Sequence, residues 1–93
     1  MGCPWATRIT DNCTGHGACP PRPSCSGSPD VFTNGLNQMR LTDCYVVHCN
    51  HGGILVGGSG SVFVNSLPAG RQGDPVNCGS FADVHSPDVR MGD

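Results

Sequence analysis

The chain has 93 residues, 37% of them hydrophobic, and a formal net charge of −2 at pH 7, with arginine at all five Lys/Arg positions. This length fits a single domain over residues 1–93 with a small core, and 14 glycines and 8 prolines favour turns and short strands over long helices. The charge gives no electrostatic basis for binding nucleic acid, and no window holds the roughly 18 apolar residues of a membrane span.

The first patterned stretch, residues 8–11, reads Arg-Ile-Thr-Asp and opens a series of the form Arg-x-[Thr/Gly]-Asp. The series recurs at residues 40–43, 71–74 and 90–93. Aspartate favours turns, and an arginine three positions earlier can pair with it. We therefore interpret each copy as an Arg–Asp pair that closes a repeat. The Pro-rich stretch CPPRPSC at residues 19–25 follows, and it predicts a rigid surface loop.

Two longer stretches predict β-hairpins. Residues 28–35 read SPDVFTNG and residues 59–66 read SGSVFVNS, and both alternate with a period of two through β-branched and aromatic residues. Asn-Gly at 34–35 and Asn-Ser at 65–66 suit tight hairpin turns, and Pro68 restricts the second return strand to an edge. The residues expected to alternate between core and interface are Val31, Phe32, Val62, Phe63 and Val64.

A third copy, SPDV at residues 86–89, stands near the end of the chain. One hairpin cannot bury its own apolar face in water, whereas three around a common axis can. The repeats therefore predict an all-β domain with threefold character. Because the third copy ends soon after it starts, we expect its hairpin to be incomplete.

The seven cysteines and four histidines predict a metal site. A disulfide scaffold is the alternative, but the odd cysteine count, the lack of a secretory signal pattern and the interspersed histidines favour ligands in a reducing compartment. His48 and His51 form an H-x-x-H pair, and His16 lies between two glycines. Imidazole and thiolate are the usual ligands of Zn²⁺, and a closed set of four is structural. The residues that remain alternative ligands are Cys44, Cys49 and His85.

Residues 58–80, GSGSVFVNSLPAGRQGDPVNCGS, resemble the PAAR-repeat family, with Pro68-Ala69-Gly70-Arg71 in place of the four family letters. Residues 11–35, DNCTGHGACPPRPSCSGSPDVFTNG, are similar to the phage branch of that family. The resemblance covers residues 8–89. The chain departs from the family pattern at Gly70, at residues 37–40, at Thr42 and at His85.

The resemblance implies a small cone of three β-hairpins that caps the end of a trimeric β-helical spike, one copy per trimer, and sharpens it for piercing an envelope. It implies one structural metal at the apex, Zn²⁺ or iron, held by His16, His48, His51 and Cys78. Such proteins lie at phage tail tips, after synthesis in the host cytoplasm, or at type VI secretion spike tips, secreted without a signal peptide. Effector or tail proteins are further partners, the membrane is contacted only mechanically, and no partner-binding residue is assigned.

Two other functions compete with this one. A disulfide-stapled secreted binding module would pair six of the seven cysteines. A zinc hydrolase would need an open coordination position and a positioned base. The chain contains neither an H-E-x-x-H motif nor any glutamate, so we expect that it is not an enzyme.

Overall fold

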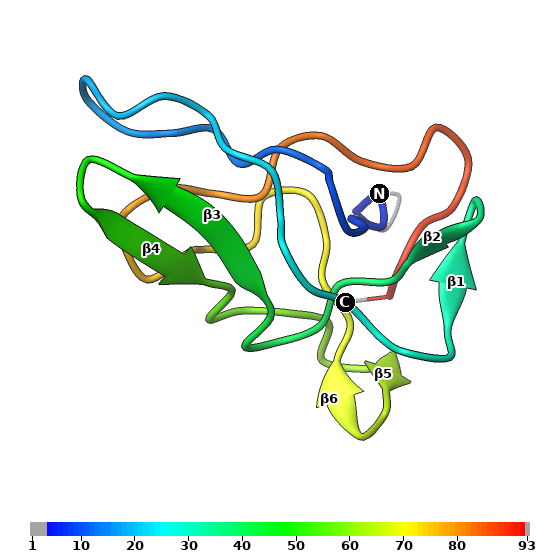
Figure 1. Cartoon of the computed structure of the whole chain (residues 1–93). Coiled ribbons are helices and arrows are strands. Elements are labelled where there is room, and N and C mark those ends of the chain that lie inside the picture. Colours follow the sequence, from blue (N-terminus) through cyan, green and yellow to red (C-terminus); the bar gives the residue numbers. More distant parts are fainter. Residues whose placement is uncertain (1–3, 93) are drawn as a thin grey trace.

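The computed structural model describes residues 4–92 and shows three short antiparallel hairpins joined by long irregular segments (Figure 1). The strands are β1 (Phe32–Thr33), β2 (Leu36–Asn37), β3 (Cys44–His48), β4 (His51–Ile54), β5 (Phe63–Val64) and β6 (Leu67–Pro68). The described residues contain no helix, so none that is long and apolar enough to cross a membrane. The prediction of an all-β fold is confirmed.

The turns of two hairpins have the backbone that their sequences predict. In β1–β2, the central residues Asn34 and Gly35 have φ angles of 54° and 78°. In β5–β6, Asn65 and Ser66 have φ angles of 52° and 66°. Positive φ at both central positions is the signature of the type I′ turn, whose twist matches that of the flanking strands. Asparagine tolerates this conformation, and this explains its place at the first turn position in both copies.

The hairpin of the third repeat, which is separate from β3–β4, is completed by the two ends of the described chain, so the expectation that it would be incomplete is wrong. Trp5 pairs antiparallel with Arg90, as Phe32 pairs with Asn37 and Phe63 with Pro68 in the other two copies. One equivalent backbone hydrogen bond closes each copy. These bonds run from Ala6 N to Val89 O, Gln38 N to Val31 O and Ala69 N to Val62 O, each 2.9 Å long. The outgoing strand of the third repeat therefore lies at the end of the sequence and its return strand at the beginning.

A closed ring of backbone hydrogen bonds joins the three repeats at their centre. Met39 N donates to Thr7 O (3.0 Å), Gly70 N donates to Met39 O (2.8 Å), and Thr7 N donates to Gly70 O (3.2 Å). Each residue holds the same position in its own repeat, so the ring defines a pseudo-threefold axis. We call these three residues the central ring.

The Arg–Asp pairs predicted from the sequence form in three repeats. The guanidinium nitrogens of Arg8, Arg40 and Arg71 lie 2.8, 3.0 and 2.8 Å from the carboxylate oxygens of Asp11, Asp43 and Asp74. Each carboxylate also accepts a hydrogen bond from the backbone N–H of its own arginine. The aspartate side chains are at most 7% exposed, so each pair fixes a buried charge at a repeat boundary. The fourth predicted pair involves Asp93, which lies outside the described residues.

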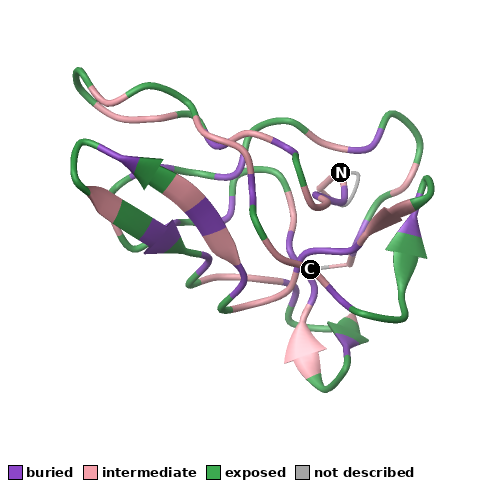
Figure 2. Cartoon of the chain, in the orientation of Figure 1, coloured by how far each residue is buried: buried purple, intermediate pink, exposed green. Residues whose placement is uncertain are grey.

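The core is small, as the low apolar content predicts, and Figure 2 shows buried residues scattered along many segments. The buried apolar residues form two clusters. The larger cluster contains Cys13, Met39, Tyr45, Leu55, Val76 and Ala82, and the smaller contains Ala6, Val64, Ala69 and Met91. Of the alternating residues named from the sequence, Val64 is buried, whereas Phe32 and Phe63 are each 58% exposed. The hairpins therefore turn one large aromatic side chain each toward the outside.

Two disulfides join residues 19–25 to β3 and the turn that follows it: Cys19–Cys49 and Cys25–Cys44. The expectation of reduced cysteines is thus wrong for these four. The segment is also more than a surface loop, because Ser24 pairs antiparallel with Tyr45. This pairing places Cys25 and Cys44 next to each other, with a Cα–Cα distance of 5.3 Å that suits a disulfide. Among the described residues Cys13 and Cys78 are free, and the remaining cysteine, Cys3, lies outside them.

Candidate metal centre

Two tight turns at one end of the molecule each present a pair of potential ligands. In the first repeat, His16 and Cys19 exchange two backbone hydrogen bonds, of 3.1 and 2.8 Å. In the second repeat, His48 pairs with His51 across the turn between β3 and β4. Residues that pair directly across antiparallel strands place their side chains on the same face, about 5 Å apart. Each turn therefore supplies two adjacent side chains.

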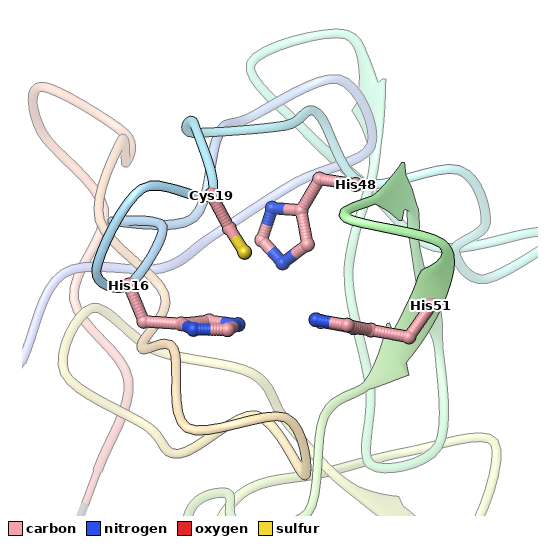
Figure 3. A group of neighbouring side chains, drawn as sticks. All are labelled: His16, Cys19, His48 and His51. Carbon is pink, nitrogen blue, oxygen red and sulfur yellow. The ribbon is translucent and has the colours of Figure 1, made fainter.

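The two pairs meet to form one group of four donors, which we call the tip cluster: His16, Cys19, His48 and His51. One ligand atom from each of these residues lies within 4.8 Å of the others. Figure 3 shows His16 and His51 pointing toward one another from opposite sides, with the His48 ring and the Cys19 sulfur beside the gap between them. Four donors around one point are the requirement for a tetrahedral metal site, and the Cys19 sulfur, which is bonded to Cys49, could act as one of them only as a free thiolate.

The three imidazole rings are packed closely. His16 and His51 are stacked, with ring centroids 5.1 Å apart and an interplanar angle of 14°. His48 meets both of them edge-on, with centroids 4.9 Å from His16 and 4.7 Å from His51. Rings at these distances bring one nitrogen each close to a common point, where a metal ion could bind them.

Hydrogen bonds orient two of the rings toward a ligand. His48 Nδ1 lies 2.7 Å from the carbonyl oxygen of Pro20, and His51 Nδ1 lies 3.2 Å from that of Gly52. Because a carbonyl oxygen only accepts, each Nδ1 donates to it, and Nε2 is the acceptor nitrogen of the neutral ring. The Nε2 of His48 lies 3.8 Å from the Cys78 sulfur. A histidine held in this way by its other nitrogen is the usual arrangement of a metal ligand.

His16 provides the direct sign that a partner belongs here. Its Nε2 is buried and has no hydrogen-bond partner among the described residues. Buried polar atoms are nearly always satisfied, and leaving one unpaired costs about 1–3 kcal/mol. A metal ion bound by the cluster would satisfy this nitrogen, so the residues present fit such an ion.

Cys78 approaches the tip cluster from the third repeat. Its free, partly buried Sγ lies 3.8 Å from His48 Nε2. Gly53 makes room for it, since a Cβ built at Gly53 would lie 3.4 Å from this sulfur and 2.6 Å from Val76 Cγ1. The third repeat thus contributes a thiol to the same end of the molecule.

The predicted ligands therefore lie near one another, with Cys78 at the edge of the group. His85 lies elsewhere: its ring stacks on Trp5 with centroids 5.6 Å apart, and its Nδ1 lies 2.7 Å from the carbonyl oxygen of Ser86. Cys44 and Cys49 are bonded in disulfides and are not ligands in this state. Cys19, which the sequence did not predict at this site, lies in the group by position but is bonded to Cys49 in this state. The spacing of His16 and Cys19 matches that of His48 and His51.

The PAAR motif family model matches residues 14–82, which include the tip cluster, Cys78 and the hairpins β1–β2 and β5–β6. Residues of this chain are also similar to "Double-stranded DNA deaminase toxin A" of Burkholderia cenocepacia (strain H111), with 37% identity over 66 residues. The match covers 69% of this chain and 5% of the toxin. The chain therefore spans only a small part of the length of this relative.

Proposed function

Because the chain belongs to the PAAR motif family, whose members form spike tips, we propose that it caps the end of a trimeric β-helical spike as one copy per trimer. The spike is that of a phage tail, and the alternative is that of a type VI secretion system. The cap sharpens the spike for piercing the envelope of a target cell. The observation that carries this proposal is the central ring, in which one chain presents three equivalent repeats around an axis.

The end that we propose for the spike is the one formed by β1–β2, β5–β6 and the pairing of Trp5 with Arg90. Figure 1 shows β1–β2 and β5–β6 directed away from the β3–β4 turn, which carries His48 and His51. Phe32 and Phe63 stand at equivalent positions there, and both are 58% exposed. The sheets of these hairpins have only two strands each, so strand edges remain for a partner to cover. A threefold partner would meet three similar surfaces.

The metal in this proposal is structural. The two core clusters include no residue from segments 14–22 or 46–53, so the two turns of the tip cluster have little apolar packing of their own. A bound Zn²⁺ would hold them together, since structural zinc supplies folding free energy of roughly 10 kcal/mol or more. The three imidazoles and the Cys78 thiolate would fill a tetrahedral site and leave no coordination position for a substrate. We propose on this basis that the chain is not itself an enzyme.

The location follows from the partner. We propose that the protein lies at the tail tip of a virion, or at the tip of a type VI secretion spike, with effector or tail proteins as further partners. The relative named as a deaminase toxin supports a link between such tips and effectors, because a segment similar to this chain occurs within that protein.

Native mass spectrometry with a candidate spike tests the proposal. We expect a complex of three spike chains and one copy of this protein, because one cap covers the whole threefold end. Phe63→Asp should weaken the complex, since it places a charge in the proposed contact. Phe81→Asp is the matched control, because Phe81 is similarly exposed, at 49%, but lies outside β1–β2 and β5–β6, in an isolated bridge with Pro75. Three caps per trimer, or equal loss of binding in both variants, would contradict the proposal.

A further inference from the structure

The sulfur of Cys19 occupies two roles that exclude each other. It is one of the four donors of the tip cluster, and it is also bonded to Cys49. Zinc and related ions bind the thiolate form of cysteine, which carries a negative charge. A sulfur in a disulfide has no such charge and is a poor ligand. Cys19 can therefore join the metal only when the Cys19–Cys49 bond is broken.

The oxidised protein still has a complete donor set. His16, His48 and His51 keep their positions, and Cys78 Sγ lies 3.8 Å from His48 Nε2. The free Cys78 thiol is thus available while Cys19 is bonded. Reduction frees a second thiol, that of Cys19, which belongs to the group of four donors and can take the fourth position in place of Cys78.

We propose that the Cys19–Cys49 disulfide is a redox switch for the metal centre. In the oxidised protein the ligands are the three histidines and Cys78, and in the reduced protein Cys19 takes the fourth position in place of Cys78. The inference rests on the proposed metal site and concerns which cysteine serves it in each redox state.

The switching step uses an external dithiol as the reductant. The dithiol passes two electrons and two protons to the protein, the Cys19–Cys49 bond breaks, and the dithiol forms its own disulfide. The Cys19 thiol then releases its proton to solvent when it binds the metal. Because the two equilibria are linked, a metal bound to Cys19 must also oppose formation of the disulfide by the same factor.

The position of Cys49 supports this coupling. Cys49 lies in the turn between the ligands His48 and His51, and its φ angle is 46°. The disulfide thus ties the turn that carries Cys19 to the turn that carries two histidines. The second disulfide, Cys25–Cys44, lies at the other end of the same pair of segments and includes no residue of the tip cluster. Reduction of Cys25–Cys44 therefore frees no ligand of the tip cluster, and this disulfide serves as a comparison for Cys19–Cys49.

The test uses a variant with Cys25→Ser and Cys44→Ser, in which Cys19–Cys49 is the remaining described disulfide. Cys78→Ser is added to this variant, so that Cys19 is the thiol under test. Cobalt(II) is titrated into the oxidised and the phosphine-reduced protein. We expect a thiolate-to-cobalt charge-transfer band only after reduction, with affinity increased by about tenfold or more, the scale of effect typical of changes around metal ligands. Adding Cys19→Ser should abolish both changes.

The outcomes separate this inference from the metal site itself. Cobalt binding that is equal in both redox states, with the disulfide shown by mass to be broken, would overturn the switch and leave the metal site standing. No cobalt binding in either state, judged by the absence of tetrahedral d–d bands, would overturn the metal site and the switch together.

A second measurement uses the wild-type sequence and does not depend on the variants folding. Zinc should slow alkylation of Cys19 in the reduced protein by about tenfold or more, because a coordinated thiolate reacts poorly. Cys49 is the internal control, since its thiol is not a ligand and should react at the same rate with and without zinc. Equal rates at Cys19 with and without zinc would contradict the proposal.

Discussion

Replacing Gly70 by alanine should destabilise the protein, although alanine is the residue that the resemblance to PAAR repeats predicts at this position. Gly70 belongs to the central ring, where the three repeats meet. A Cβ built on it would lie 2.8 Å from Leu55 Cδ2 and 3.1 Å from both Met39 Cβ and Thr7 Cγ2. Carbon atoms prefer separations of about 3.5–4.0 Å, so at least one of these neighbours must move.

The size of the effect follows from two opposing contributions. Overpacking a core typically costs about 1–3 kcal/mol, whereas replacing glycine reduces the freedom of the unfolded chain and returns about 0.4–1 kcal/mol. We expect a net loss of about 1–2 kcal/mol, which in a domain of this size lowers the melting temperature by roughly 5–15 °C. Thermal denaturation followed by circular dichroism, with disulfides intact and one fixed zinc concentration, measures the change.

Two further variants make the test specific. Gly52→Ala is the matched control, because its nearest added contact would be an ordinary 3.7 Å to Val47 Cγ2, and it should leave the melting temperature nearly unchanged. Leu55→Val removes the closest neighbour of the added methyl, so Gly70→Ala should cost less in that background. A Gly70→Ala protein as stable as the wild type, or an equal cost in both backgrounds, would refute the proposed packing at the axis.

Three other substitutions test separate parts of the account. His16→Ala should remove the bound metal and much of the roughly 10 kcal/mol that structural zinc supplies, as measured by metal content and melting temperature, whereas His85→Ala should leave the metal in place. Asn65→Ala should raise the pKa of the Asp30 carboxyl in a carboxyl NMR titration, because the hydrogen bond from Asn65, followed by that from Ser28, lowers this pKa. Since the pKa is lower in the folded than in the unfolded protein, the stability that it contributes is present above the unfolded value of 3.8 and is lost as the pH falls through the folded pKa. An unchanged pKa of Asp30 would exclude this cause. Gly73→Ala should cost about 1 kcal/mol although its Cβ would meet no atom within 4 Å, because its φ angle is 89°; an unchanged melting temperature would show that the backbone adapts.

Local sequence features predicted the parts of the fold that depend on neighbouring residues. The turns at Asn34 and Asn65 follow from the preference of asparagine for positive φ, and they form as predicted. The pairs of arginine with the aspartate three positions later, as in Arg8–Asp11, also form as predicted. In each case the interacting groups lie within a few residues, so the pattern is visible in a short window.

The features that were missed depend on pairing between distant segments. The hairpin of the third repeat brings Trp5 next to Arg90, and its two strands lie at opposite ends of the sequence. The copy at 86–89 therefore predicted an incomplete hairpin. The disulfides follow from the alignment of residues 19–25 with β3, which spacing alone does not give. The place of Cys19 beside the histidines depends on its pairing with His16, which matches that of His51 with His48 and is not visible in the Pro-rich stretch that it opens.

The central claim is that three repeats of a PAAR-family cap converge on one structural metal ion. Elemental analysis of the wild-type protein, purified without added metal, tests this claim most directly. The account predicts about one equivalent of zinc or iron per chain, because His16, His48, His51 and Cys78 provide one closed set of four ligands. A folded protein with no bound metal would contradict it.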